Sequence, residues 1–221
     1  MSSEPFVERS LDPQIVGFLH RPALPVKDAL VLTHGAGSNC RAPLLVEVAD
    51  AFAKAGILVL RCDLPYRQIS PHGLPKPGGA GRDQEGLRNA VAAVRKLAPG
   101  RLTLGGHSYG GRQASMLAAS TPGLVESLLL LSYPLHPPRQ PERLRVQHFP
   151  QLQTPMFFVH GTRDPFGSEE ELTEARELIP ARTELFFITG AGHDLKVGKK
   201  KEPEDEPSLA ERIRERWAAF M

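Results

Sequence analysis

The chain has little of what disulfide-rich, membrane-spanning or nucleic-acid-binding proteins contain in excess. Its 221 residues include two cysteines, Cys40 and Cys62, too few for the framework of bridges that stabilises small secreted domains. No uninterrupted apolar run approaches the roughly 20 residues of a membrane-spanning helix. The net charge is only +2, which gives no argument for binding to nucleic acid or to a membrane surface.

The first residues also lack the features of a secretion signal. Met1 to Phe6 contains no basic segment followed by an apolar run. Together with the scarcity of cysteine, this predicts a cytoplasmic protein. The length and the 41% hydrophobic content are enough for a sizeable core, so we expect residues 1–221 to form a single domain.

Apolar runs alternate with helix-forming segments along most of the chain. Buried strands are expected at 29–33, 57–63, 101–104, 128–132, 156–160 and 185–188, and an edge strand at 15–19. Helices are expected at 44–55, 85–97, 113–119, 169–178 and 209–220, and a long Pro- and Gly-rich loop at 67–83. This alternation predicts an α/β fold whose mostly parallel sheet is covered by helices on both faces. Ligands of such folds bind at the carboxyl edge of the strands.

One segment combines a strand, a sharp turn and a helix around a serine. Gly106-His107-Ser108-Tyr109-Gly110 matches G-x-S-x-G, lies between the expected strand 101–104 and the expected helix 113–119, and so predicts a nucleophile elbow. Such a turn strains the serine backbone and admits only small residues two positions before and after it. Ser108 is therefore the candidate nucleophile. The alternative is an ordinary glycine-rich turn.

A candidate acid and a candidate base follow two later strands. Asp164 comes after the strand 156–160, and His193 comes after the strand 185–188. The order serine, acid, histidine is that of the α/β-hydrolases. A serine hydroxyl needs a base to take its proton, and an acid fixes the tautomer of the histidine. Asp63, which also ends a strand, is the alternative acid.

A hydrolase of this kind also needs two N–H donors for the oxyanion that forms on the substrate carbonyl. The backbone N–H of Tyr109, directly after the serine, is one candidate. The other is expected from the loop His34-Gly35-Ala36-Gly37, at Ala36 or Gly37, where small residues let the backbone approach the substrate. The alternative for this loop is a plain glycine turn.

Five segments in this order resemble the dienelactone hydrolase-like group of the α/β-hydrolases. They are Leu32 to Gly37, Gly105 to Arg112, Ser132 to Pro138, Gly161 to Gly167, and Gly192-His193. Within that group the chain is most similar to small proteins related to the hydrolase-like domain of NSL complex subunit 3 and to its testis-expressed relatives. The resemblance implies the fold and the triad. True dienelactone hydrolases use a cysteine nucleophile where this chain has Ser108, which argues against dienelactone as the substrate.

The segment between the strands 128–132 and 156–160 is rich in Pro and Arg and shows no long amphipathic helix. We therefore expect no substantial lid and an open cleft. His34 is a candidate for contacting substrate. Four arginines are candidates for an anionic substrate group or, alternatively, structural residues: Arg67, Arg112, Arg139 and Arg163. Lys196 and the charged run 199–206 are expected to form a solvated loop or, alternatively, a partner site.

These observations predict a serine hydrolase that cleaves a small carboxylic ester or thioester through an acyl-enzyme on Ser108. No metal or other cofactor is expected, because no metal-ligand cluster or phosphate-binding motif is found. The expected partner is the small-molecule substrate, with no nucleic acid and no membrane. Two alternatives stay open: a peptidase of the same fold, and a hydrolase-like scaffold that binds a partner without catalysis.

Overall fold

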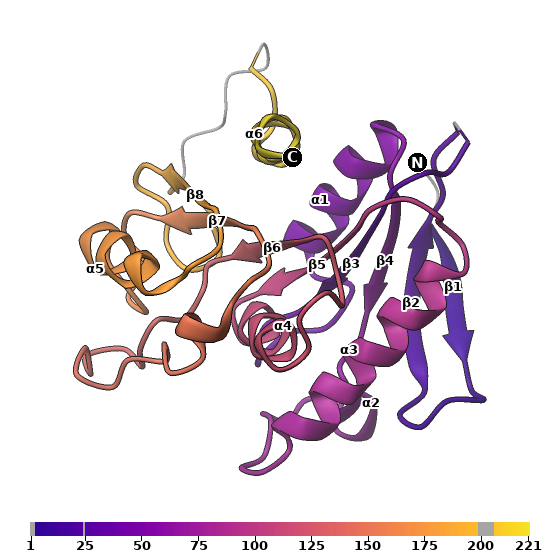
Figure 1. Ribbon diagram of the computed structural model, residues 1–221, viewed down its shortest axis with the longest axis horizontal. Coiled ribbons are helices and arrows are strands. Elements are labelled where there is room, and N and C mark those ends of the chain that lie inside the picture. Colours follow the sequence, from indigo (N-terminus) through magenta and orange to yellow (C-terminus); the bar gives the residue numbers. More distant parts are fainter. Residues whose placement is uncertain (1–2, 24, 199–205) are drawn as a thin grey trace.

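The computed structural model describes residues 3–23, 25–198 and 206–221, and these contain one eight-stranded sheet (Figure 1). The strand order is β1-β2-β4-β3-β5-β6-β7-β8. Strand β2 is antiparallel to both of its neighbours, and the other adjacent strands are parallel. The strands are β1 (Ser3–Glu8), β2 (Ile15–His20), β3 (Ala29–Thr33), β4 (Leu58–Cys62), β5 (Leu102–His107), β6 (Ser127–Leu131), β7 (Met156–Gly161) and β8 (Thr183–Ile188).

Helices cover both faces of this sheet, as the apolar strands predict. The helices are α1 (Pro43–Lys54), α2 (Pro65–Ile69), α3 (Ala80–Arg95), α4 (Tyr109–Ser120), α5 (Glu169–Ala175) and α6 (Leu209–Phe220). Helices α1 and α6 pack on one face, where the rings of Phe52 and Trp217 lie 5.0 Å apart. Helices α3 and α4 pack on the other face through residues such as Leu87 and Leu117 (Figure 1). This is the predicted α/β architecture, a mostly parallel sheet with helices on both faces.

Three local expectations are wrong. The strand at 15–19 is not the edge of the sheet, because β1 pairs with its outer side. The segment 67–83 is not one loop: it contains the end of α2 and the start of α3, which begins at Ala80 rather than at 85. The segment 169–178 is not one helix, since α5 ends at Ala175 and a 3-10 helix (η2, Arg176–Leu178) follows.

The chain between β6 and β7 carries no large insertion. This segment, 132–155, is fully described, and its regular structure is one short 3-10 helix (η1, Phe149–Gln151). Among the described residues, the connection from β6 to β7 therefore carries no helical lid at the carboxyl edge of the sheet. Within the described residues, no helix is both long and apolar enough to cross a bilayer. Residues 199–205 of the charged run lie outside the described part of the chain.

Candidate active site

Ser108 occupies the turn between β5 and α4 in a strained backbone conformation. Its φ is 52° and its ψ is −117°, a region that a residue with a side chain rarely adopts. Two hydrogen bonds fix the turn: the Ser108 N–H donates to the Leu131 carbonyl at 2.8 Å, and the Ser108 carbonyl accepts from the Arg112 N–H at 3.0 Å. The strain expected for a nucleophile elbow is present.

The two glycines that flank the serine are required by close packing. A Cβ atom on Gly106 would lie 2.8 Å from the Gly110 carbonyl carbon. A Cβ atom on Gly110 would lie 2.6 Å from the His34 carbonyl oxygen. Both distances are shorter than any tolerable contact with backbone, so the turn can form only with glycine at these positions.

The structure brings Ser108, His193 and Asp164 into one hydrogen-bonded row. The Ser108 hydroxyl lies 2.8 Å from Nε2 of His193, and Nδ1 of His193 lies 2.8 Å from Oδ2 of Asp164. The three residues follow β5, β8 and β7 at the same edge of the sheet. With a carboxylate at Nδ1, the imidazole carries its proton there and presents the unprotonated Nε2 to the serine. This is the arrangement in which a histidine can accept the serine proton.

The Asp164 carboxylate is held at both oxygens. Its side chain is fully buried, and Oδ1 accepts the Phe166 N–H at 2.9 Å while Oδ2 faces His193. His160 Nε2 lies 3.8 Å from the same Oδ2, but its proton goes to the Gly167 carbonyl at 2.8 Å. Burial lowers the pKa of His160, so that ring stays neutral and does not compete for the carboxylate.

Two further residues hold the His193 ring and backbone, and neither role was predicted from the sequence. The ring of Phe166 lies 4.2 Å from that of His193, tilted by 33°. His107 donates from Nε2 to the His193 carbonyl at 2.8 Å. Phe166 is two residues after the candidate acid, and His107 directly precedes the candidate nucleophile. This closeness in sequence to the candidate residues was the only feature that could have indicated their roles.

The backbone N–H of Tyr109 is free to face a ligand. Tyr109 is the first residue of α4, and the first N–H groups of a helix have no partner inside it. The side chain of Tyr109 points elsewhere: its hydroxyl donates to Oδ2 of Asp83 at 2.8 Å. The position is therefore compatible with the expected oxyanion donor.

The loop after β3 is oriented by Tyr66 and Arg67, which follow β4. The Tyr66 hydroxyl donates to the Ala36 carbonyl at 2.8 Å and lies 3.3 Å from the Gly35 carbonyl. Nη2 of Arg67 also donates to the Ala36 carbonyl, at 2.8 Å. In a trans peptide the N–H points opposite to the preceding carbonyl. The N–H groups of Ala36 and Gly37 are thus turned away from Tyr66.

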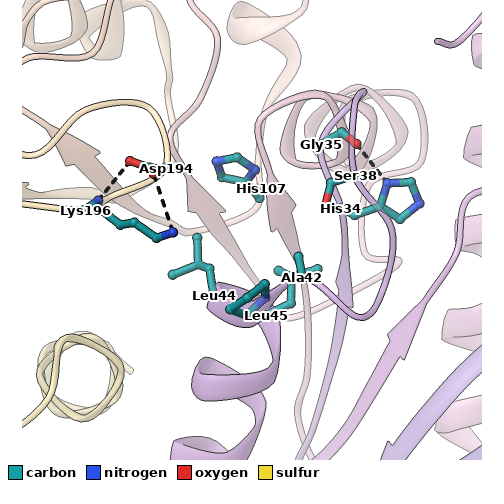
Figure 2. Close-up of a pocket in the computed structure, with 10 residues that line it drawn as sticks. His34, Gly35, Ser38, Ala42, Leu44, Leu45, His107, Asp194 and Lys196 are labelled. Carbon is teal, nitrogen blue, oxygen red and sulfur yellow. Dashed lines mark hydrogen bonds and ion pairs between the residues drawn. The ribbon is translucent and has the colours of Figure 1, made fainter. Parts of the chain in front are cut away.

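This arrangement changes the interpretation of two candidate substrate-contacting residues. His34 is fully buried, and its Nδ1 donates to the Gly35 carbonyl at 2.9 Å (Figure 2). Its Nε2 accepts the Leu64 N–H at 3.1 Å. No ring nitrogen of His34 is left for substrate. Arg67 is buried too, and donates to backbone carbonyls of its own turn as well as to Ala36. Both residues support the loop instead.

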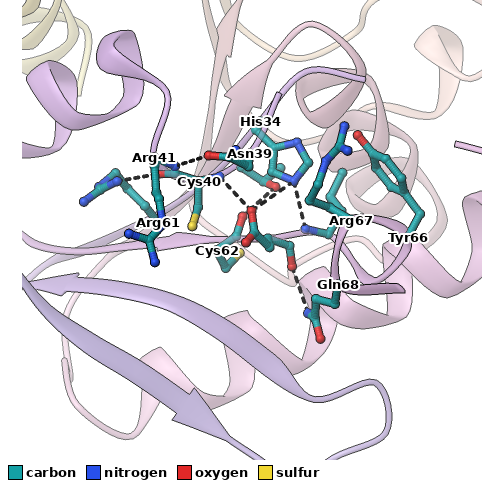
Figure 3. Close-up of polar contacts among 12 residues, drawn as sticks. His34, Asn39, Cys40, Arg41, Arg61, Cys62, Tyr66, Arg67 and Gln68 are labelled. Carbon is teal, nitrogen blue, oxygen red and sulfur yellow. Dashed lines mark hydrogen bonds and ion pairs between the residues drawn. The ribbon is translucent and has the colours of Figure 1, made fainter. Parts of the chain in front are cut away.

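Asp63, the alternative acid, belongs to this supporting network and does not contact His193. Its Oδ1 accepts the Cys40 N–H at 2.7 Å and lies 3.5 Å from Nε2 of His34. Figure 3 shows His34, Cys40 and Arg67 gathered around this turn. Cys40 and Cys62 are buried and unbridged, and burial raises the pKa of both thiols, that of Cys40 to about 12. Neither thiol is poised as a nucleophile.

The arginines near the site differ in exposure. Arg112 lies one helical turn after Ser108, and its Nε is buried without a hydrogen-bond partner in the described part of the chain. Burial and the charge of Arg112 lower the pKa of Arg145. Arg139 and Arg163 are exposed. Across residues 3–23, 25–198 and 206–221, no group of three or more His, Cys, Asp or Glu could hold a metal ion.

A mostly parallel sheet with a strained serine elbow after its central strand defines an α/β-hydrolase fold. Residues 26–221 match the model of the family described as the alpha/beta hydrolase domain, and the chain belongs to this family.

Solved structures with the same fold include a dienelactone hydrolase and a serine hydrolase without lid. Dienelactone hydrolase from Anabaena variabilis ATCC 29413 superimposes with a TM-score of 0.75 at 18% identity, covering 99% of this chain and 96% of that one. Est1E from Butyrivibrio proteoclasticus gives 0.72 at 15% identity, covering 100% and 99%. A serine hydrolase without lid from Xanthomonas campestris gives 0.65 at 16% identity, covering 88% and 87%.

Proposed function

We propose that this protein is a serine hydrolase that cleaves a small carboxylic ester or thioester, with Ser108, His193 and Asp164 as its catalytic triad. The observation that supports this most is the unbroken row of two 2.8 Å hydrogen bonds that ends on a strained serine. A scaffold that only binds a partner has no need of this combination of strain and alignment.

In the acylation step, His193 Nε2 takes the proton of Ser108 as Oγ attacks the ester carbonyl. The negative charge that develops on the carbonyl oxygen is stabilised by the N–H of Tyr109 and by that of Ala36 or Gly37. The carbon–oxygen bond to the alcohol then breaks, and the alcohol leaves with the proton from His193. Asp164 stabilises the imidazolium while it exists.

In the deacylation step, water replaces the alcohol. His193 Nε2 takes a proton from water, and the resulting oxygen nucleophile attacks the acyl carbon. The bond to Ser108 Oγ breaks, and the serine recovers its proton from His193. The products of the two steps are an alcohol and a carboxylic acid, and one water molecule is consumed. These residues carry the reaction without a metal or other cofactor.

The absence of a lid supports a preference for small substrates, because nothing in the described chain covers a long acyl chain. The neighbours are consistent with ester chemistry: one is a dienelactone hydrolase, and Est1E has been solved with ferulic acid bound. Arg112 and Arg163 are proposed to contact an anionic group where the substrate has one. We also propose that the protein acts in the cytoplasm on a small molecule and, within its group, is related to the hydrolase-like domain of NSL complex subunit 3.

A fluorophosphonate probe tests the proposal directly, since it reacts with an activated serine. We expect covalent labelling of the wild type and none of Ser108→Ala. The absence of labelling in folded wild-type protein would favour the scaffold function.

A panel of p-nitrophenyl esters from acetate to palmitate tests the substrate class. We expect kcat/KM to be highest for the short acyl chains. The corresponding p-nitroanilides serve as the comparison, and faster cleavage of these amides would favour a peptidase. Faster turnover of the long-chain esters would contradict the preference for small substrates.

A further inference from the structure

A cavity of about 240 Å³ lies at the carboxyl edge of the sheet, next to the candidate triad (Figure 2). One wall is apolar and comes from the start of α1, at Ala42, Leu44 and Leu45. The opposite wall is formed by the loop after β3, at Gly35, and by His107. The volume is below the roughly 300–1,000 Å³ that is usual for sites of drug-sized ligands, so the cavity suits a small group.

Gly35 connects this cavity to the candidate nucleophile. A Cβ atom on Gly35 would lie 3.0 Å from Nδ1 of His107 and 3.4 Å from the Cβ of Ser108. Because glycine has no such atom, this part of the cavity wall packs close to His107 and Ser108. Ser108 itself does not line the cavity, but Gly35, which packs close to it, and His107, which precedes it in the chain, both do.

The cavity lies on the His193 side of the serine. His107, in its wall, donates to the His193 carbonyl, and its ring lies 5.1 Å from the His193 ring. Asp194, directly after His193, and Lys196 form the rim. The departing oxygen of an ester must receive its proton from His193 Nε2, so the alcohol part of the substrate also lies on this side.

The lining gives little that would hold a charged group. Lys196 Nζ lies 3.9 Å from Oδ2 of Asp194, so the charges at the rim balance (Figure 2). Both nitrogens of His34 are bonded to backbone. Burial lowers the pKa of His107, whose Nε2 proton already goes to a carbonyl, so its ring is neutral. The remaining lining consists of an apolar wall, the uncharged Ser38 side chain and one uncharged imidazole edge.

We propose that this cavity binds the short, uncharged aliphatic alcohol part of the ester, and that Leu44 limits its length. The inference rests on the proposed function and adds to it the identity of the leaving group. A site for alcohol has a further consequence. An alcohol bound there can attack the acyl-enzyme in place of water, giving a new ester and returning the proton through His193 to Ser108.

The test is the partition of the acyl-enzyme between water and added alcohol. The wild type is given p-nitrophenyl acetate with methanol, 1-butanol or 1-hexanol, and the yield of alkyl acetate is compared with that of acetate. We expect 1-butanol to give saturable ester formation in clear preference to methanol. Leu44→Trp should reduce the butanol partition at least roughly tenfold, the scale of a lost apolar contact in a pocket. Leu44→Ala should extend the preference to 1-hexanol.

Leu74→Trp is the matched control. Leu74 is exposed and lines a separate groove beside Tyr66, so the same substitution there should leave the partition unchanged. Since the partition compares two fates of one intermediate, a general loss of activity does not alter it. Release of p-nitrophenol with partitions that do not respond to either Leu44 variant overturns the alcohol site alone. Failure of Ser108 to form any acyl-enzyme overturns the proposed function, and this inference falls with it.

Discussion

At the scale of single residues, the three members of the candidate triad are held to different degrees. Asp164 is fully buried with both oxygens occupied, whereas the His193 side chain keeps 23% of its surface exposed. The position of the Asp164 carboxylate is therefore fixed, and the orientation of the His193 ring is set by its contacts with Asp164 and Phe166. A substitution at the acid should therefore act through the orientation and tautomer of the histidine.

Asp164→Asn tests this role. An amide at this position can donate to Nδ1, which leaves the proton on Nε2 and prevents the ring from accepting the serine proton. A related change in a serine protease lowers kcat by roughly 10⁴, and we expect a loss of about two to four decades here. The measurement is kcat on a short p-nitrophenyl ester. Asp63→Asn is the control and should retain most activity; if it is the damaging change and Asp164→Asn is mild, the assignment of the acid is wrong.

Tyr66→Phe tests the orientation of the loop after β3. Loss of the hydroxyl removes one of the two donors to the Ala36 carbonyl and leaves Arg67 as the other. Deleting a direct oxyanion donor costs roughly 10²–10³ in kcat, and Tyr66 acts through the loop, so we expect about a tenfold loss with little change in KM.

The inhibitor profile separates this positioning role from a structural one. A trifluoromethyl ketone, which forms an oxyanion on Ser108, should bind Tyr66→Phe more weakly in proportion to the loss of kcat. Tyr133→Phe is the matched control, because its hydroxyl donates to the Arg145 carbonyl away from this loop. Equal effects of both variants on the inhibitor would refute the role of Tyr66.

The alignment of Ser108, His193 and Asp164 could be predicted from the sequence, but the residues that support it could not. Ser108, Asp164 and His193 each follow a clear apolar strand, and their order is specific to one fold class. Tyr66 also follows a strand, but a tyrosine after a strand does not by itself indicate a role in the site. Its role depends on a hydrogen bond to the Ala36 carbonyl, 30 residues earlier. The hydrophobic periodicity of the sequence gives no information about such a contact.

At the scale of secondary structure elements, a long amphipathic pattern in the sequence predicts the bounds of a helix better than a short one. The segment 209–220 has an amphipathic pattern over three turns, and α6 has these bounds. The five-residue helix α2 ends within a Pro- and Gly-rich segment and is too short to show a period. Strand β1 has few apolar residues and none of them is fully buried, so its sequence does not indicate a strand. The interpretation of β2 as the edge strand is wrong for this reason.

The elbow between β5 and α4 is the element on which the site depends. Gly110→Ala would place a Cβ 2.6 Å from the His34 carbonyl, so the loop after β3 or the helix must move. We expect destabilisation by about 1–3 kcal/mol, as for other overpacked sites, and loss of esterase activity. Urea unfolding and ester hydrolysis measure the two effects.

Gly81→Ala is the corresponding control. Gly81 lies in the first turn of α3 with nothing within 4 Å of its Cβ position, so alanine should leave activity unchanged and should not lower stability. Equal loss of stability in both variants would mean that crowding at the elbow is not the cause.

At the scale of the whole molecule, the α/β architecture could be predicted because each buried strand is apolar throughout. The antiparallel hairpin of β1 and β2 could not, since it depends on pairing with β4 rather than on its own pattern. The site lies at the parallel strands and its position was therefore unaffected by this error.

The fold also buries several histidines whose charge state links stability to pH. Five histidines have pKa values lowered by burial: His20, His34, His107, His148 and His160. For His148 the pKa falls from 6.5 to about 4, because the ring is buried and faces the Arg112 charge. Its Nε2 is bonded to the Ser115 hydroxyl at 2.8 Å. The folded protein thus keeps a neutral ring where the unfolded chain binds a proton.

The sign of the pH effect follows from this difference in bound protons. Between about pH 6.5 and pH 4 the unfolded state binds more protons at His148, so the free energy of unfolding decreases as the pH falls through this window. Each such proton contributes a slope of at most about 1.4 kcal/mol per pH unit. His148→Gln removes one titrating group while an amide can still bond to Ser115, so its stability should decline less steeply than that of the wild type. Urea unfolding at pH 7, 6, 5 and 4.5 gives both slopes, and equal slopes would show that His148 is not held neutral by the fold.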